Sequence, residues 1–257
     1  MHNILRYTLL ENQRARFTLA AVVLIGAIAA MAHYSSTLNY NAGRYTLTVL
    51  AFGLYFTRLV LLAFALLAPV LALTREIESG TIFVILAHPT TRSRYLLGKY
   101  AAFLLLYGLL AAAAALALAL LAFAFGTRDD PAPLRLPAFV AAEWMSGAVL
   151  LALVFALAMA VRSALLPPLL GAAIFFISFL LEYAREAATL GAPSAVRLFY
   201  TLLYYAFPNF RLFHTEKAVL YGLSLPPAHW AALGAYTLLT AGVFLGIALV
   251  LFRRREL

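Results

Sequence analysis

The feature that most constrains this chain is a series of six long apolar runs separated by short polar or charged connections. Their approximate bounds are residues 17–33, 45–73, 96–125, 137–161, 164–181 and 231–252. A membrane span takes about 20 apolar residues, and most of these runs reach that length. Backbone groups in a bilayer must find their hydrogen bonds inside the segment, which favours helices. The sequence therefore predicts an all-α integral membrane protein with six transmembrane helices.

Composition supports this class. The chain is 65% hydrophobic and 11% charged, whereas soluble domains average about 45–50% apolar and about 25% charged residues. Six spans and their connections use up the 257 residues, so we expect one transmembrane domain over residues 1–257. We expect it in a plasma membrane or bacterial inner membrane, in contact with lipid.

The net charge of +9 follows from arginines and lysines scattered between the apolar runs. This distribution is typical of the cytoplasmic loops of membrane proteins, and it does not favour a nucleic-acid partner. Basic residues close to the span ends orient a membrane protein most strongly, and they fit best with both termini in the cytoplasm. Before the first span, residues 3–16 alternate apolar and charged side chains, which predicts a short amphipathic helix on the membrane surface.

An outer segment, residues 182–230, precedes the last span and is rich in aromatic residues. Its most apolar piece, residues 195–207, is too short to cross a bilayer. Tyrosine and tryptophan rings favour the headgroup region of a membrane. We therefore expect interfacial or re-entrant helices on the outer face.

No catalytic or metal-binding constellation is present in the sequence. The five histidines are scattered and there is no cysteine. Gly98-Lys99 lacks the surroundings of a phosphate-binding loop, because Ser93 stands where that loop needs its first glycine and Tyr100 where it needs Ser or Thr. We expect neither enzymatic activity nor a cofactor in this chain.

Two charged residues lie inside the apolar runs. Arg58 is about 20 Å along the second run and Glu143 about 9 Å along the fourth, at 1.5 Å per helical residue. Charges at this depth are costly unless they face protein or water. They could belong to a translocation pathway, or they could form a buried ion pair that fixes helix contacts. The sequence leaves both interpretations open, as it does whether the two side chains pair.

The connection between the second and third runs, residues 74–95, is more charged than a simple link requires. Glu76 and Glu78 begin a helix-like stretch over residues 75–88, an apolar patch follows, and Pro89 ends it. Thr90 and Thr91 can cap the next helix. An amphipathic cytoplasmic helix of this kind is typical of a docking element for a soluble partner.

The pattern of this connection resembles the signature of type-2 ABC (ABC-2) transporter permeases. The motif is Arg-Glu-x-Glu-x-Gly-Thr, then Leu-x-x-Pro-x-x-Arg, then Gly-Lys at residues 98–99. The matching residues are Arg75, Glu76, Glu78, Gly80, Thr81, Leu86, Pro89 and Arg92. A weaker resemblance covers residues 204–213.

The resemblance implies a coupling helix at residues 74–95 that docks a separate ATP-binding subunit. It also implies a second permease subunit, as a homodimer or heterodimer, and alternating access driven by ATP. ATP and Mg²⁺ would then bind to the partner subunit and not to this chain. The substrate does not follow from the sequence.

Two other functions remain open. A polytopic scaffold or assembly protein could use the same connection to recruit a cytoplasmic partner that is not an ATPase. A membrane-embedded lipid enzyme would need clustered polar residues near an interface, and Glu143 and His229 are too isolated to provide them.

Overall fold

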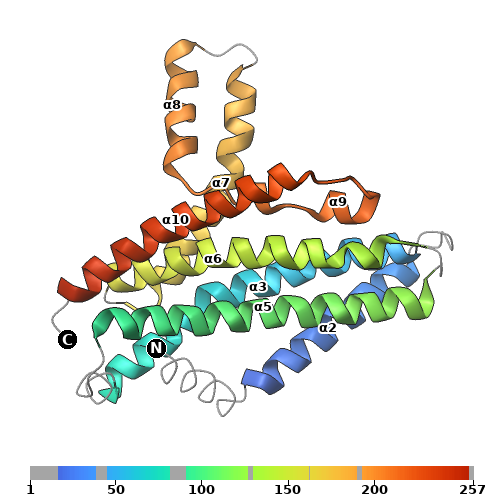
Figure 1. Ribbon diagram of the computed structural model, residues 1–257, viewed down its shortest axis with the longest axis horizontal. Helices are drawn as coiled ribbons and strands as arrows, with labels where there is room; N and C mark the ends of the chain where they lie inside the picture. Colours follow the sequence, from blue (N-terminus) through green and yellow to red (C-terminus); the bar gives the residue numbers. More distant parts are fainter. Residues whose placement is uncertain are drawn as a thin grey trace.

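A computed structural model of the protein describes residues 17–38, 45–81, 91–126, 130–161, 163–189 and 193–254. Within these residues the fold is all-helical (Figure 1). The helices and 3₁₀ turns are α2 (Phe17–Leu38), α3 (Tyr45–Glu78), α5 (Arg92–Phe125), η1 (Ala132–Arg135), α6 (Leu136–Ala160), α7 (Leu166–Thr189), α8 (Ser194–Ala206), η2 (Phe210–Phe213), α9 (Glu216–Tyr221) and α10 (Pro227–Arg254). The predicted amphipathic helix at residues 3–16 lies outside the described residues.

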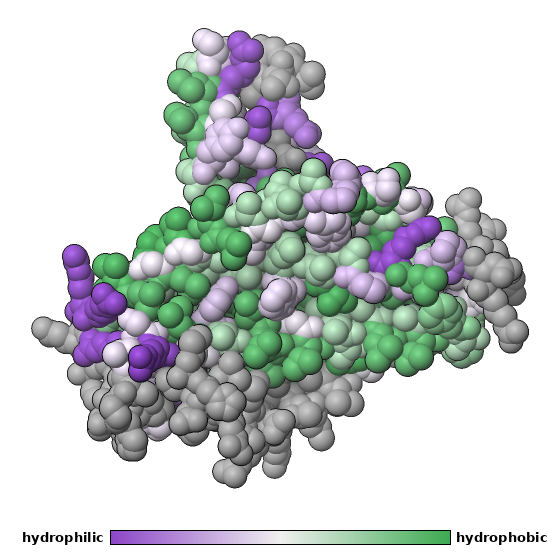
Figure 2. Space-filling model, viewed as in Figure 1, coloured by the Kyte–Doolittle hydropathy of each residue, from purple (hydrophilic) through white to green (hydrophobic). Residues whose placement is uncertain are grey.

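Five helical stretches are long and apolar enough to cross a membrane: α3, α5, η1 with α6, α7 as far as Glu186, and α10. The first predicted span contributes a shorter apolar helix, Val23–Leu38. Figure 2 shows apolar side chains along the side of the bundle and hydrophilic ones at its two ends, while the projecting α7–α8 part carries both kinds. The protein is therefore a multi-pass membrane protein.

The centre of the bundle is formed by α3, α5 and α6, with α10 lying along α6 and α2 beside α3 and α5. The buried core between them combines aliphatic and aromatic side chains, with Phe64 and Phe155 each in ring contact with Phe103. Gly53 lets α3 approach α5 closely, because a Cβ atom at this position would lie 2.2 Å from the Leu118 side chain. Small residues serve this purpose at helix contacts in membranes.

The bundle has two ends (Figure 1). At the basic end, α3 ends, α5 begins and α10 ends, and Arg75, Arg94, Arg253 and Arg254 are exposed. At the far end, α2 ends beside the start of α3, where the His33 Nδ1 atom and the Tyr45 hydroxyl are 2.7 Å apart. Phe125, the last residue of α5, contacts both rings.

The outer segment contains helices, as predicted. α8 packs against α7, and Figure 1 shows α8 and the last part of α7 standing out from the side of the bundle. None of the α8 side chains is buried. η2 and α9 instead lie on the bundle, against α6 and α7 and against α3, α6 and η1 respectively.

Five helices, α2, α3, α5, α7 and α10, extend beyond their predicted apolar bounds, because hydropathy marks the membrane core and not the end of hydrogen bonding. α3 continues through the predicted boundary at Leu73 to Glu78, so residues 75–78 are its last turn and not the start of a separate helix. It ends where Gly80 adopts a left-handed backbone with φ of 69°, a conformation that favours glycine. Likewise, α7 extends to Thr189 and α10 begins at Pro227.

Candidate functional site

The first candidate site is the pair of helix stems that flank the charged connection at the basic end. Thr91 caps α5 by accepting a hydrogen bond from the Arg94 backbone N–H at 3.3 Å, which confirms the predicted cap. Beyond α3, the Ser79 and Thr81 hydroxyls lie 2.8 Å apart. Leu86 and Pro89, two residues of the predicted docking set, lie outside the described residues.

The two acidic residues of the first stem face in different directions. Glu78 is exposed, as is Arg75. Glu76 is only 2% exposed and is turned into the bundle. Of the two carboxylates, only that of Glu78 is therefore available to a partner on this surface.

Glu76 belongs to a buried cluster that we name the Glu76 clamp, made of Glu76, Tyr95 and Lys99. The Lys99 ammonium forms an ion pair with Oε1 of Glu76, and the Tyr95 hydroxyl donates to Oε2. Tyr95 and Lys99 lie one turn apart on α5, so they share a face. Both are fully buried. The clamp joins the last turn of α3 to the first turns of α5, and so holds both stems of the connection.

Arg92, another residue of the predicted docking set, contacts the end of α10. Its Nη1 atom donates to the carbonyl oxygens of Phe252 at 3.2 Å and Arg253 at 3.3 Å. In return, Nη2 of Arg253 donates to the Ser93 hydroxyl at 3.1 Å. A cation at the C-terminal carbonyls of a helix is favourable. The basic end is thus held together by contacts from α3 to α5 and from α5 to α10.

The second candidate site lies inside the bundle and is named the Arg58 cluster: Arg58, Tyr107, Glu143 and Glu216. Nε of Arg58 donates to Oε1 of Glu143 at 2.6 Å, and its guanidinium also forms an ion pair with Oε1 of Glu216. The Tyr107 hydroxyl donates to Oε2 of Glu143 at 3.3 Å. The structure therefore places Arg58 and Glu143 in contact, and adds Glu216 from the outer segment.

The Arg58 cluster is shielded from solvent and joins four helices. The side chains of Arg58, Glu143 and Glu216 are 13%, 1% and 4% exposed. They come from α3, α6 and α9, while Tyr107 comes from α5. Buried charges persist where they are paired and hydrogen-bonded. The cluster therefore ties the outer segment to the membrane helices.

His214 lies next to the Arg58 cluster, with Nδ1 at 3.8 Å from Oε2 of Glu216. Burial, together with the positive charges of Arg58 and Arg211, lowers the pKa of His214 to about 3. Its imidazole is therefore neutral at pH 7 and brings no positive charge to Glu216. Arg58 remains the cation that contacts both carboxylates.

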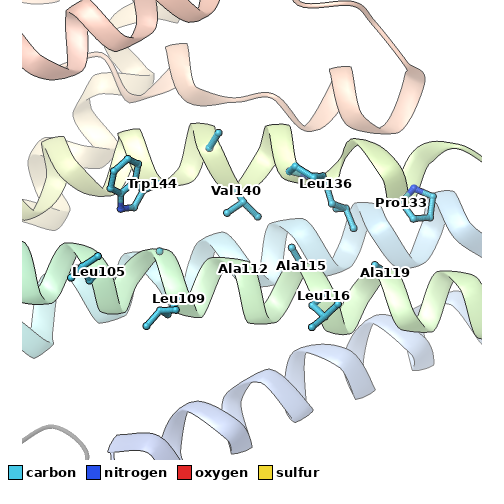
Figure 3. Close-up of a pocket in the computed structure, with 13 residues that line it drawn as sticks. Leu105, Leu109, Ala112, Ala115, Leu116, Ala119, Pro133, Leu136, Val140 and Trp144 are labelled. Atoms are coloured by element: carbon cyan, nitrogen blue, oxygen red, sulfur yellow. The ribbon is translucent and has the colours of Figure 1, made fainter. Parts of the chain in front are cut away.

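A third feature is an apolar groove between α5 and α6, with a volume of about 640 Å³. Figure 3 shows Leu136, Val140 and Trp144 of α6 beside Ala112 and Ala115 of α5. The Trp144 indole N–H is already bonded to the Leu104 carbonyl oxygen at 3.2 Å. The groove is therefore suited to apolar groups such as lipid chains.

The described residues contain no group of three or more His, Cys, Asp or Glu side chains that could hold a metal ion. The protein thus has the Glu76 clamp beside the charged connection at one end of an apolar helix bundle, and the buried Arg58 cluster further along the bundle. The family model described as ABC-2 family transporter protein matches residues 8–257. The chain belongs to the ABC-2 transporter family. A search of the curated proteins found no match.

Membership of the ABC-2 family makes this chain a membrane component of a transporter, and implies an ABC ATP-binding subunit as its partner. The family match covers both stems of the connection and both buried clusters. It does not assign roles to individual side chains, which must be argued from their contacts.

Sequence reasoning missed two members of the Arg58 cluster. Glu216 lies in a polar, irregular stretch where no periodicity shows which way a side chain faces. Tyr107 looks like one more aromatic residue of an apolar span. The two partners of Glu76 left a weak signal in the sequence. Tyr95 and Lys99 stand four residues apart at the start of a span, which places two polar groups on one face of that helix.

Proposed function

We propose that this chain is the permease subunit of an ABC exporter that docks a separate ATP-binding subunit through the connection between α3 and α5. The basic end is the cytoplasmic end, six helices span the membrane, and both termini are cytoplasmic. ATP and Mg²⁺ bind to the partner. A second permease subunit, identical or homologous, completes the pathway, and ATP-driven closure of the partner alternates access to it.

The observation that carries this proposal is the arrangement of the two stems, in a chain of the ABC-2 family. Exposed Arg75 and Glu78 offer charge to a partner, whereas Glu76 is held inside by Lys99 and Tyr95. A connection used for docking needs both an exposed surface that the partner can bind and flanking helix ends that stay fixed in the bundle. These residues supply the two requirements separately.

The roles of the predicted docking residues divide accordingly. Glu78 and Arg75 contact the partner directly, and Gly80 and Thr81 shape the turn beside them. Glu76 acts as a positioning residue: it passes a displacement of the connection to α5 through the buried ion pair.

Replacing Glu78 with lysine tests the docking surface. The change reverses a charge on an exposed position and leaves the buried clamp intact. Like charges at a protein interface weaken binding, so we expect copurification of the ATP-binding subunit to fall by about tenfold. Membrane insertion and the yield of the permease itself should stay at the parent level.

Glu186→Lys is the matched control, because it makes the same charge change at an exposed position on α7, away from the connection. It should leave copurification unchanged. An unchanged yield of the complex with Glu78→Lys would contradict the docking surface.

A scaffold that recruits a partner other than an ATPase is the alternative function. Purification in mild detergent with the natural partners separates the two. The exporter gives a bound subunit with vanadate-sensitive ATP hydrolysis. A stable complex without ATP hydrolysis would favour the scaffold.

A further inference from the structure

The short helix α9 is fastened to the bundle at both of its ends. In its first turn, Glu216 forms the ion pair with Arg58 of α3. In its last turn, the carbonyl oxygen of Val219 accepts a hydrogen bond from Nη1 of Arg135 at 3.3 Å. Ala218 and Val219 are buried beneath the helix. These contacts make α9 a cover over the bundle near its far end.

Arg58 forms ion pairs with two carboxylates, and losing one of them has a different consequence from losing the other. Glu143 belongs to α6, which is part of the bundle, whereas Glu216 belongs to α9. If α9 moves away, Arg58 keeps its ion pair and its second hydrogen bond with Glu143. Glu216 moves toward water, where a carboxylate is well solvated. Lifting α9 therefore strands no unpaired charge inside the bundle.

We propose that α9 is a gate at the far end of the bundle. The ion pair between Glu216 and Arg58, which we call the grip, holds this gate closed. Glu143 keeps Arg58 paired when the gate opens, so the grip is reversible. The gating role rests on the proposed transport function. The grip itself does not, because it is a property of the resting chain.

A small cavity lies beside Arg58 and Glu143, next to the segment that leads into α9. Its volume is about 10 Å³, roughly the space of one water molecule. Arg58, Tyr107, Glu143, Ser146 and His214 contribute its polar lining. Because η2 and the loop to α9 form part of its wall, through Phe210 and His214, lifting them opens the cavity. The buried carboxylate of Glu143 would then face water from the far side.

The experiment uses the natural absence of cysteine from this chain. A Val219→Cys reporter, at a position 1% exposed, is treated in intact cells with a membrane-impermeant thiol reagent. We expect slow labelling in the parent and about tenfold faster labelling when Glu216→Ala is added, because a hydrogen bond to a charged group is lost. Glu216→Asp keeps the charge with a shorter reach and should restore much of the protection.

Lys217→Ala is the matched control, since Lys217 is the exposed neighbour of Glu216 on the same helix. It should leave the labelling rate unchanged. A second reporter, Leu151→Cys in the bundle core and outside the lining of that cavity, should stay unlabelled in every variant. Equal labelling of Val219→Cys with and without Glu216→Ala would overturn the grip. Labelling of Leu151→Cys in the Glu216→Ala variant would also overturn it, by making Glu216 a residue that holds the whole fold.

The gating role is decided in the assembled complex with its ATP-binding subunit. ATP hydrolysis should accelerate labelling of Val219→Cys without any change at Glu216. An unchanged rate during hydrolysis would overturn the gate while leaving the grip in place. Failure to assemble any ATPase complex would instead count against the proposed function, and the labelling without nucleotide would still decide the grip.

Discussion

Replacing Arg58 with methionine should destabilise the bundle by about 3–5 kcal/mol, because it leaves the Glu143 carboxylate buried without its cation and removes the ion pair that holds Glu216. Glu143 is 1% exposed and belongs to α6, so water cannot take the place of the lost guanidinium there without opening the bundle. Methionine keeps an unbranched apolar side chain in the same space. The measurement is the thermal unfolding midpoint in detergent, followed by loss of the monodisperse permease peak.

The control for this prediction neutralises the whole cluster. Adding Glu143→Gln and Glu216→Gln to Arg58→Met removes the unpaired charges while keeping the shape of the site. Replacing every member of a buried ion pair or triad is often neutral, whereas removing one member is costly. The triple variant should therefore recover most of the lost stability. An Arg58→Met variant as stable as the parent would show that these carboxylates do not depend on Arg58 to compensate their charge.

The sequence predicted the helices well because apolar length is a strong signal. Each predicted apolar run corresponds to a helix. The predicted and observed ends differ most where a helix continues from the hydrophobic stretch into polar residues. α3 shows why: the turn at Thr74–Glu78 is polar, but its backbone bonds continue until Gly80. Hydropathy cannot locate an end that depends on the backbone conformation of one glycine.

The buried clusters were only partly predictable from the sequence. Arg58 and Glu143 stood out because each interrupts an apolar run. Glu216 did not, since a glutamate in a polar stretch is expected to face water. Glu76 and Glu78 have similar surroundings in the sequence, yet one is buried and the other exposed. Which face of α3 contacts α5 is decided by the packing of the whole bundle, and a local pattern does not contain that information.

Glu76→Gln should separate docking from force transmission in the assembled transporter. The amide keeps the size of the side chain and leaves Glu78 exposed, so the ATP-binding subunit should copurify at the parent level. The buried Lys99 ammonium, however, loses its ion pair with Glu76, and removing one partner of a buried pair costs about 3–5 kcal/mol. The stem of α3 then no longer holds α5. We expect ATP hydrolysis to persist while transport falls by about tenfold or more, measured together in proteoliposomes.

The charge exchange Glu76→Lys with Lys99→Glu is the matched test of this explanation. Both side chains remain buried between α3 and α5, and an ion pair of opposite polarity can form at the same place. We expect the double variant to recover part of the transport that either single change removes, whereas Glu78→Lys combined with Lys99→Glu should recover none.

Arg58 lies about 27 Å from Glu76 along α3, at 1.5 Å per residue. Because the two clusters share that helix, a transport defect in Glu76→Gln should be accompanied by loss of any ATP-dependent labelling at Val219→Cys. Normal ATP-dependent labelling at that position would show that α9 receives its signal by another route than the Glu76 clamp.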